Sequence, residues 1–276
     1  MRHEPAPADI PSELVLAATY TREVRAGIER IWENVLDWEH LPALHDIYFN
    51  HVALIESGSW GWRVELTKAR TADRRMLLKL QIDRAKARYR VRTLAGDGMG
   101  TEISTLLEAL GPRRTAIEVR FYLPEHRPER LAALGEKYQA SYARLWDQDE
   151  AMMMRRETLL ARSRTPSERS GALLALGPIS ELRSRLPLLV ELHGEPFRIL
   201  ELEDGVLVAH TTICPHWLGP LDEAVPENGV LRCPWHGYRF DLRTGMGVDG
   251  RGCRLAPAPR VVVDPVTGEA AVGFVL

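Results

Sequence analysis

The chain has 276 residues and a formal net charge of -2, which gives no general attraction to nucleic acid or to an anionic membrane surface. It contains no apolar run of about eighteen residues, the length that a membrane-spanning helix needs. The first residues, MRHEPAPADIPSE, lack the apolar core of a secretory signal, and only three cysteines occur. These features predict a cytoplasmic protein with no membrane span and one large or two ordinary domains.

The first 161 residues follow strand and helix patterns in an order that indicates one domain. Residues 13–21 alternate like a strand, residues 24–37 place apolar side chains at helical spacing, and a long helical pattern runs from about 130 to 161. Between them lie strand-like segments at residues 51–56, 60–67, 76–83, 88–94, 101–107 and 115–123. This order resembles the helix-grip fold (START or Bet v 1-like). In that fold an antiparallel sheet wraps a long helix and leaves an apolar cavity.

A polar stretch rich in serine and arginine follows, and we assign residues 162–175 to an interdomain linker. Residues 176–276 then have the short alternating runs and turn residues of an all-β domain. The runs lie at residues 188–192, 197–202 and 206–212, with a closing hairpin at 260–264 and 269–275. The sequence therefore predicts an α+β chain with a helix-grip domain at 1–161 and an all-β domain at 176–276.

Two clusters of cysteine and histidine carry the strongest chemical signal. Cys214 and His216 form the first, and Cys233 and His236 form the second. A Rieske centre binds one iron of a [2Fe–2S] cluster through two thiolates and the other through two imidazoles. Each Cys–His pair here would supply one thiolate and one imidazole. Zinc also accepts two cysteines and two histidines, but its sites favour separate Cys–Cys and His–His pairs. A third interpretation is that the cysteines are only buried core residues and the histidines only hydrogen-bonded structural ones. It gives no reason for a cysteine and a histidine to occur together twice. The pattern favours the [2Fe–2S] cluster.

The residues around both clusters, HWLGPL and HGYRFD, resemble the cluster-binding loops of Rieske ferredoxins and ring-hydroxylating oxygenases. Respiratory Rieske proteins carry an extra cysteine in each loop, and a serine and a tyrosine that donate hydrogen bonds to sulfur. The corresponding positions here are Gly219, Trp235, Tyr238 and Phe240. Because fewer donors to sulfur lower the reduction potential, we expect a low-potential centre. Cys253, the third cysteine, is expected to be a structural thiol.

A helix-grip domain beside a Rieske domain resembles the Rieske non-haem iron oxygenases, which hold a second, mononuclear iron. Residues 33–45 contain Glu-x3-Asp-x2-His-x4-His, similar to the stretch that supplies two histidine ligands in that family. The resemblance implies that His40 and His45 bind Fe(II) and that Asp37 bridges toward the Rieske centre. Two histidines and one carboxylate hold Fe(II) while leaving positions open for O₂ and substrate. The histidines would lie about 140° apart on a continuous helix, so we expect Pro42 to break it.

The third iron ligand is expected on the long helix. Apolar side chains recur along it at three- and four-residue spacing, and Asp149 falls next on that line, where an acid is costly unless paired or metal-bound. Asp147 and Glu150 lie off the line, so we expect them to be solvated or on the helix flank. Residues 148–150 also resemble the segment that carries the third ligand in the oxygenases. The alternative for Asp149 is a helix cap, and for the histidines a surface or capping position.

The chain departs from that family in its reversed domain order, its short length and Trp217, where many members have arginine. The reversed order leaves open whether electrons cross within one chain or between chains. The resemblance implies an O₂-dependent oxygenase, of hydroxylase or demethylase type, that acts on a hydrophobic small molecule. It also implies an external ferredoxin or flavin reductase and a homo-oligomer, a trimer by analogy. One alternative is a Rieske ferredoxin-like carrier fused to a ligand-binding helix-grip module without mononuclear iron. Another is an oxygenase subunit that needs a separate catalytic partner.

Overall fold

The computed structural model describes residues 11, 13–161 and 173–274. The chain divides into two compact units, Met1–Arg155 and Arg156–Leu276, and each is described by itself below. The expected linker lies outside the described residues except for its last three positions, where β8 (Leu174–Pro178) begins.

In the described part of the first unit, seven antiparallel strands form one sheet in the order β1-β7-β6-β5-β4-β3-β2. The strands are β1 (Val15–Val24), β2 (Phe49–Gly58), β3 (Gly61–Lys68), β4 (Thr71–Asp83), β5 (Arg88–Ala95), β6 (Glu102–Gly111) and β7 (Arg114–Leu123). Strands β2 to β7 follow one another as hairpins, with the short 3-10 turn η1 (Arg84–Lys86) between β4 and β5. β1 completes the sheet by pairing with β7, with Val24 opposite Thr115.

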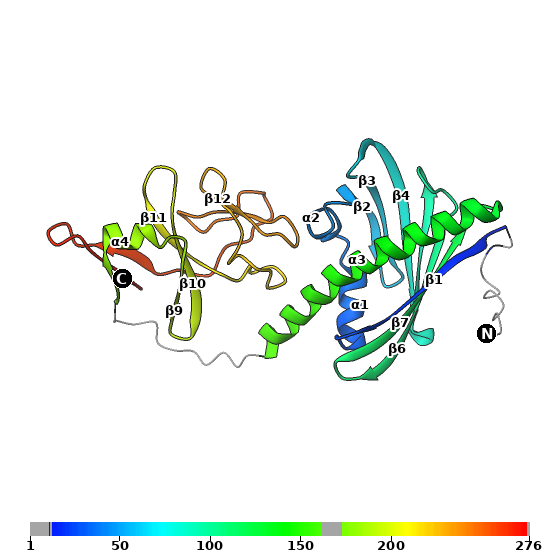
Figure 1. Cartoon of the computed structure of the whole chain (residues 1–276), viewed down its shortest axis with the longest axis horizontal. Helices are drawn as coiled ribbons and strands as arrows, with labels where there is room; N and C mark the ends of the chain where they lie inside the picture. Colours follow the sequence, from blue (N-terminus) through cyan, green and yellow to red (C-terminus); the bar gives the residue numbers. More distant parts are fainter. Residues whose placement is uncertain (1–10, 12, 162–172, 275–276) are drawn as a thin grey trace. The chain divides into compact units, whose positions relative to one another are not determined.

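Three helices accompany the sheet: α1 (Ile28–Leu36), α2 (Leu41–Leu44) and α3 (Pro128–Ala161). α3 crosses one face of the curved sheet (Figure 1). It approaches β1 closely at Gly135, where a Cβ atom would lie 2.6 Å from the carbonyl oxygen of Ala17. Trp146 and Met153 of α3 join the buried core that the sheet and α1 form. This is the helix-grip fold that the sequence predicted.

Over residues 173–274, the second unit contains short strands and one short helix. The elements are β8 (Leu174–Pro178), α4 (Ile179–Ser184), β9 (Leu188–Leu192), β10 (Glu195–Glu201), β11 (Leu207–Thr211), β12 (Val230–Arg232), β13 (Arg239–Asp241), β14 (Arg260–Val263) and β15 (Glu269–Gly273). They pair as β11-β10-β9, β12-β13 and β14-β15-β8. The closing hairpin is present as β14 and β15, with Arg260 opposite Gly273. The α+β class is confirmed, and α4 is an addition that no sequence pattern predicted.

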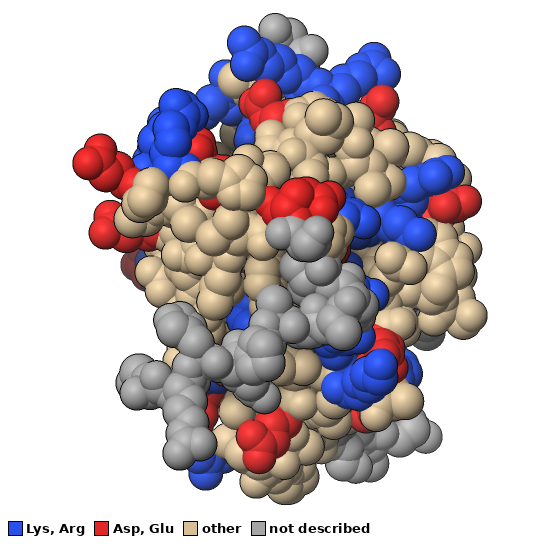
Figure 2. Space-filling view, turned by 90° about the vertical axis from the view of Figure 1, so that its right-hand side faces the viewer, with Lys and Arg blue, Asp and Glu red and all other residues tan. Residues whose placement is uncertain are grey.

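Figure 2 shows a face on which basic and acidic side chains are interspersed among uncharged ones. Within the described residues, no helix is both long enough and apolar enough to cross a bilayer, although α3 has 34 residues.

Candidate metal centres

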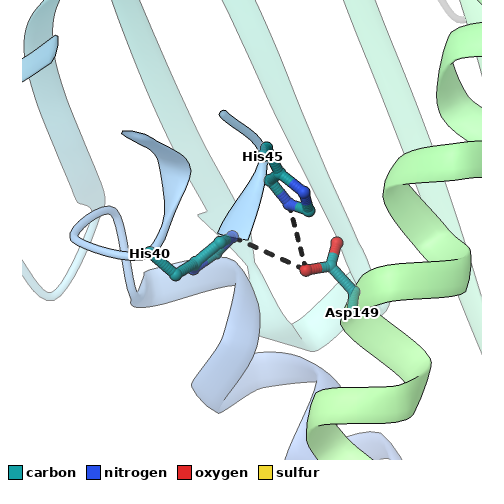
Figure 3. A group of neighbouring side chains, drawn as sticks. All are labelled: His40, His45 and Asp149. Carbon is teal, nitrogen blue, oxygen red and sulfur yellow. Dashed lines mark ion pairs between the residues drawn. The ribbon is translucent and has the colours of Figure 1, made fainter. Parts of the chain in front are cut away.

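His40, His45 and Asp149 lie together in the first unit and point toward one another (Figure 3). His40 is the N-cap of α2, His45 is its C-cap, and Asp149 comes from α3. Nε2 of His45 lies 3.2 Å from Oδ1 of Asp149, and Nε2 of His40 lies 3.6 Å from the same oxygen. All three residues are buried. The structure thus brings together the three residues predicted as iron ligands, while their role as ligands stays a prediction.

The turn that directs the two histidines inward differs from the predicted one. α1 ends at Leu36, and the N–H of Asp37 donates to the carbonyl oxygens of Glu33 and Asn34. A new helix, α2, then begins, with Pro42 in its first turn. Proline is accepted there because first-turn N–H groups have no helical partner to lose. The expectation that Pro42 breaks the helix is therefore wrong, since the break precedes it.

Two neutral side-chain amides contact the group formed by His40, His45 and Asp149. Nδ2 of the buried Asn34 donates to Oδ1 of Asp149 over 3.1 Å. Oε1 of Gln148 lies 2.9 Å from Nδ1 of His45. Because a carbonyl oxygen only accepts, Nδ1 of a neutral His45 carries the proton and Nε2 keeps its lone pair on the side of Asp149. The sequence gave no role to either amide; the signal for Asn34 was a polar residue on the apolar face of α1.

Asp37 lies against His40. Its Oδ2 is 3.4 Å from Nδ1 of His40, and its side chain is 8% exposed. A carboxylate on the far nitrogen of an imidazole fixes which nitrogen faces the centre and strengthens that nitrogen as a donor. The structure therefore places Asp37 where it can orient His40.

The environment of Asp149 keeps its carboxylate ionised. Burial acts to raise the pKa of Asp149. When the imidazoles are protonated, the charge and hydrogen bond of His45, the charge of His40 and the hydrogen bond of Asn34 together outweigh burial and lower the pKa of Asp149. The three side chains therefore offer a metal ion one anionic carboxylate and two imidazole nitrogens.

Glu150, the neighbour of Asp149, is buried, so the expectation of a solvated side chain is wrong for it. Its Oε1 accepts from Nε of Arg25 over 2.6 Å and from the backbone N–H of Arg25 over 3.1 Å, and its Oε2 pairs with Arg22. Arg22 also reaches Asp147, which is exposed as expected. Arginines at the end of β1 and just beyond it thus neutralise an acid that the helix pattern alone places on the flank.

A cavity of about 140 Å³ adjoins the three residues. Its lining is largely apolar and includes no lysine or arginine among the described residues. The apolar and aromatic lining residues are Val35, Leu41, Phe49, Trp62, Leu78, Leu80, Tyr89, Val91, Tyr142, Leu145 and Trp146. Burial, with nearby Tyr89, Tyr138 and Asp149, raises the pKa of Tyr142, so its hydroxyl stays protonated. The space joins a polar end at the candidate ligands to an uncharged, mostly apolar end.

The second unit presents the four predicted cluster ligands on two loops of matching construction. The N–H of Cys214 donates to the carbonyl of Gly219, and the N–H of Cys233 donates to the carbonyl of Tyr238, each over 2.8 Å. Each bond therefore closes a turn of the same length. The rings of His216 and His236 pack edge to face, with centroids 4.4 Å apart and planes at 88°. The structure brings one cysteine and one histidine from each loop to the same place.

The two thiols of this site are fully buried side by side. The hydrogen bond between them, with burial, raises the pKa of Cys214. Two adjacent buried thiolates need cations close by, which the irons of a cluster would supply. Gly219 makes room beside them, because a Cβ there would lie 2.6 Å from Sγ of Cys233.

The residues between and after the ligands shape the loops without adding cysteines. Trp217 has a left-handed backbone, with φ of 48°, and its ring tilts against His236 at 5.8 Å. Phe240 and Trp235 are buried, and Tyr238 stacks on His216. Cys253 is half-buried and free.

Comparison with known proteins identifies the second unit. Residues 172–259 match the family described as Rieske [2Fe-2S] domain, so the chain carries such a domain toward its C-terminal end. One segment is 38% identical over 63 residues to the oxygenase component of dicamba O-demethylase from Stenotrophomonas maltophilia, covering 23% of this chain and 19% of that protein. Another is 40% identical over 47 residues to human apoptosis-inducing factor 3, covering 17% of this chain and 8% of that protein. The chain therefore spans a small part of these relatives.

Solved structures resemble each half at low similarity. Zhui aromatase/cyclase from Streptomyces sp. R1128 is 14% identical with a TM-score of 0.43, over 54% of this chain and 99% of that one. The ferredoxin of carbazole 1,9a-dioxygenase from Nocardioides aromaticivorans IC177 is 25% identical with a TM-score of 0.32, over 37% of this chain and 98% of that one. The helix-grip assignment rests on the strand order and on α3.

Proposed function

We propose that the chain is an O₂-dependent Rieske-type non-haem iron oxygenase that acts on a small hydrophobic molecule. The observation that carries this proposal is the convergence of His40, His45 and Asp149 beside an apolar cavity, in a chain that also contains a Rieske domain. An electron-transfer domain alone would not require a second buried set of metal-binding atoms.

The donor set fits a mononuclear Fe(II). Two imidazoles and one ionised carboxylate are the ligands of the facial arrangement found in non-haem iron oxygenases, and neighbouring groups hold each of them. Bound there, iron would activate O₂ with electrons from the Rieske domain, placing one or both oxygen atoms in an organic product. The protein's own part is to fix the ligands. Gln148 holds His45, Asn34 holds Asp149, and Asp37 holds His40.

The cavity limits the substrate. A space of about 150 Å³ in another protein accepts benzene, so the 140 Å³ here suits one ring with few substituents. An anionic substrate would find no lysine or arginine in the described lining, whereas a neutral one would need none. The proposed substrate class is therefore a neutral, single-ring or similarly sized apolar molecule, and Tyr142 can donate one hydrogen bond to it.

The electron path begins at the Rieske domain. We propose that four residues bind the [2Fe–2S] cluster: Cys214, His216, Cys233 and His236. An external ferredoxin or flavin reductase would reduce this cluster. Asp37 has a second proposed role, a hydrogen bond to a cluster histidine, which is carried over from the family resemblance. A carboxylate between two imidazoles would orient both and shorten the electron path.

The alternative is a Rieske electron carrier fused to a helix-grip module that binds a hydrophobic ligand without metal. The observation in its favour is that the Rieske family match spans residues 172–259 and leaves the first unit outside. The two hypotheses differ in metal content.

Iron analysis of the full chain, reconstituted without oxygen, separates them. The oxygenase proposal expects three iron atoms per chain, and two in His40→Ala and in Asp149→Ala, with the visible absorption of the cluster unchanged. The matched control is His51→Ala, because His51 is an exposed histidine of β2; it should retain three. Two atoms in the unaltered chain would refute the mononuclear centre and leave the carrier. Three atoms without turnover alongside a reductase, O₂ and single-ring neutral compounds would indicate a subunit that needs a catalytic partner.

A further inference from the structure

Tyr238 contacts both a proposed cluster ligand, His216, and a cation, Arg251. The ring of Tyr238 lies flat on the ring of His216, with centroids 4.2 Å apart and planes 16° from parallel. The guanidinium carbon of Arg251 also lies over the Tyr238 ring, 4.4 Å from its centroid. Arg251 comes from a loop that carries none of the proposed cluster ligands. A cation over a tyrosine face is attracted by the ring's negative π-cloud.

The same guanidinium also contacts the second cluster loop. Nη1 of Arg251 donates to the carbonyl oxygen of His236 over 3.0 Å. One cation thus reaches His216 through the Tyr238 ring and His236 through its backbone. Since the two stacking distances are 4.2 and 4.4 Å, the guanidinium carbon lies within about 9 Å of the His216 ring, close enough for its charge to be felt at partial burial.

Backbone bonds fix the loop that carries Arg251. The N–H of Val248 donates to the carbonyl of Arg239 over 2.9 Å, and the N–H of Gly247 to that of Cys253 over 2.8 Å. Asp249 accepts the backbone N–H groups of both Arg239 and Arg251, at 3.1 and 3.2 Å. The position of the guanidinium is therefore set by the fold of the loop.

Asp249 carries a countercharge to Arg251. Its Oδ2 lies 3.8 Å from Nε of Arg251, and the arginine side chain remains 42% exposed. Removing the guanidinium would take away a positive charge and leave the Asp249 carboxylate without it. Both effects would make the surroundings of the [2Fe–2S] cluster more negative. One-electron reduction adds a negative charge to a [2Fe–2S] cluster, and nearby positive charge favours the reduced form.

We propose that Arg251, stacked through Tyr238 on His216, is a positioning residue that raises the reduction potential of the Rieske cluster. The proposal rests on the assignment of the cluster ligands and is independent of the mononuclear iron.

The test is a redox titration of the cluster in the full chain, with dithionite as reductant and the reduced signal followed by electron paramagnetic resonance. Arg251→Met should lower the ratio of reduced to oxidised cluster by about tenfold at a given potential, which is 59 mV for a one-electron couple. Arg251→Lys should lower it less, and Asp249→Asn should raise it. Arg260→Met removes an exposed arginine of β14 and should leave the potential unchanged.

Two tyrosine variants test the stack itself. Tyr238→Phe keeps the ring and should keep the potential, whereas Tyr238→Leu should lower it. A fall in Tyr238→Phe as large as in Tyr238→Leu would assign the effect to the hydroxyl and overturn the stacking proposal. Equal reduction potentials in Arg251→Met and the unaltered chain would also overturn the proposal. This holds even if Arg251→Met contains less cluster, because Arg251 would then only support the loop. If Arg251→Met holds no cluster, Arg251→Lys and Asp249→Asn still give the two opposite shifts.

Discussion

Gln148 offers a quantitative test of how the candidate iron site is held. Its carbonyl accepts from Nδ1 of His45 at 2.9 Å, which commits Nε2 to the side of Asp149. Gln148→Leu removes this acceptor with little change in side-chain volume. The imidazole then loses its preferred tautomer and orientation, and divalent metal should bind more weakly.

The expected size follows from the contact. A neutral hydrogen bond contributes about 0.5–1.5 kcal/mol, and loss of an outer partner of a metal ligand typically weakens metal affinity by about 10–100-fold. For one neutral, half-buried bond we expect about tenfold, or about 1.4 kcal/mol. Gln148→Glu keeps an acceptor at the same place and should bind metal at least as tightly as the unaltered chain.

The assay is an anaerobic titration of chain that holds the cluster but no mononuclear metal, with Co(II) followed by its visible absorption. Gln139→Leu is the matched control, because Gln139 lies on the same helix and donates to the carbonyl of Thr19 instead. Equal Co(II) affinities for Gln148→Leu and Gln139→Leu would refute the tautomer argument. A loss shared by Gln148→Glu would point to helix packing instead.

Two further predictions concern stability and cluster assembly. Glu150→Gln should lower the free energy of unfolding of metal-free chain by about 2 kcal/mol at neutral pH, less than for a wholly buried pair because Arg25 is 71% exposed. Burial acts to raise the pKa of Glu150, but the hydrogen bonds of Arg25 and Arg22 outweigh it and lower that pKa. The stabilisation is therefore full above the unfolded pKa and lost as pH falls through the folded one, so urea unfolding of the two proteins should converge in acid; a constant difference would contradict this. Gly219→Ala places a Cβ 2.6 Å from Sγ of Cys233 and should abolish most of the cluster absorption, whereas Gly111→Ala, which meets no atom within 4 Å, should lose much less; equal loss would contradict the steric reason.

Periodic patterns predicted most of the architecture. The strands of the first sheet are eight or more residues long, and the apolar line along α3 led to Asp149, now found beside His40 and His45. Local spacing also paired the cysteines and histidines of the second unit, because each loop contains its own pair. These signals lie within single segments and need no knowledge of distant neighbours.

The features that the sequence did not reveal depend on contacts between distant segments. Glu150 is buried because Arg22 and Arg25 lie against it, more than a hundred residues earlier in the chain. Asn34 gains its role only when α3 brings Asp149 to it. Arg251 reaches Tyr238 through a loop whose position depends on several backbone bonds. Helical spacing alone cannot show any of these partners.

The placement of Asp149 on the last helix has a consequence for how the first unit folds. His40 and His45 lie near the start of that unit, and Asp149 lies near its end. An ion shared by them would cross-link the chain across a loop of roughly a hundred residues, and closing long loops removes the most entropy from the unfolded chain. Bound iron would then stabilise the folded unit as a cross-link, so that the lifetime of the folded unit would depend on the supply of the metal.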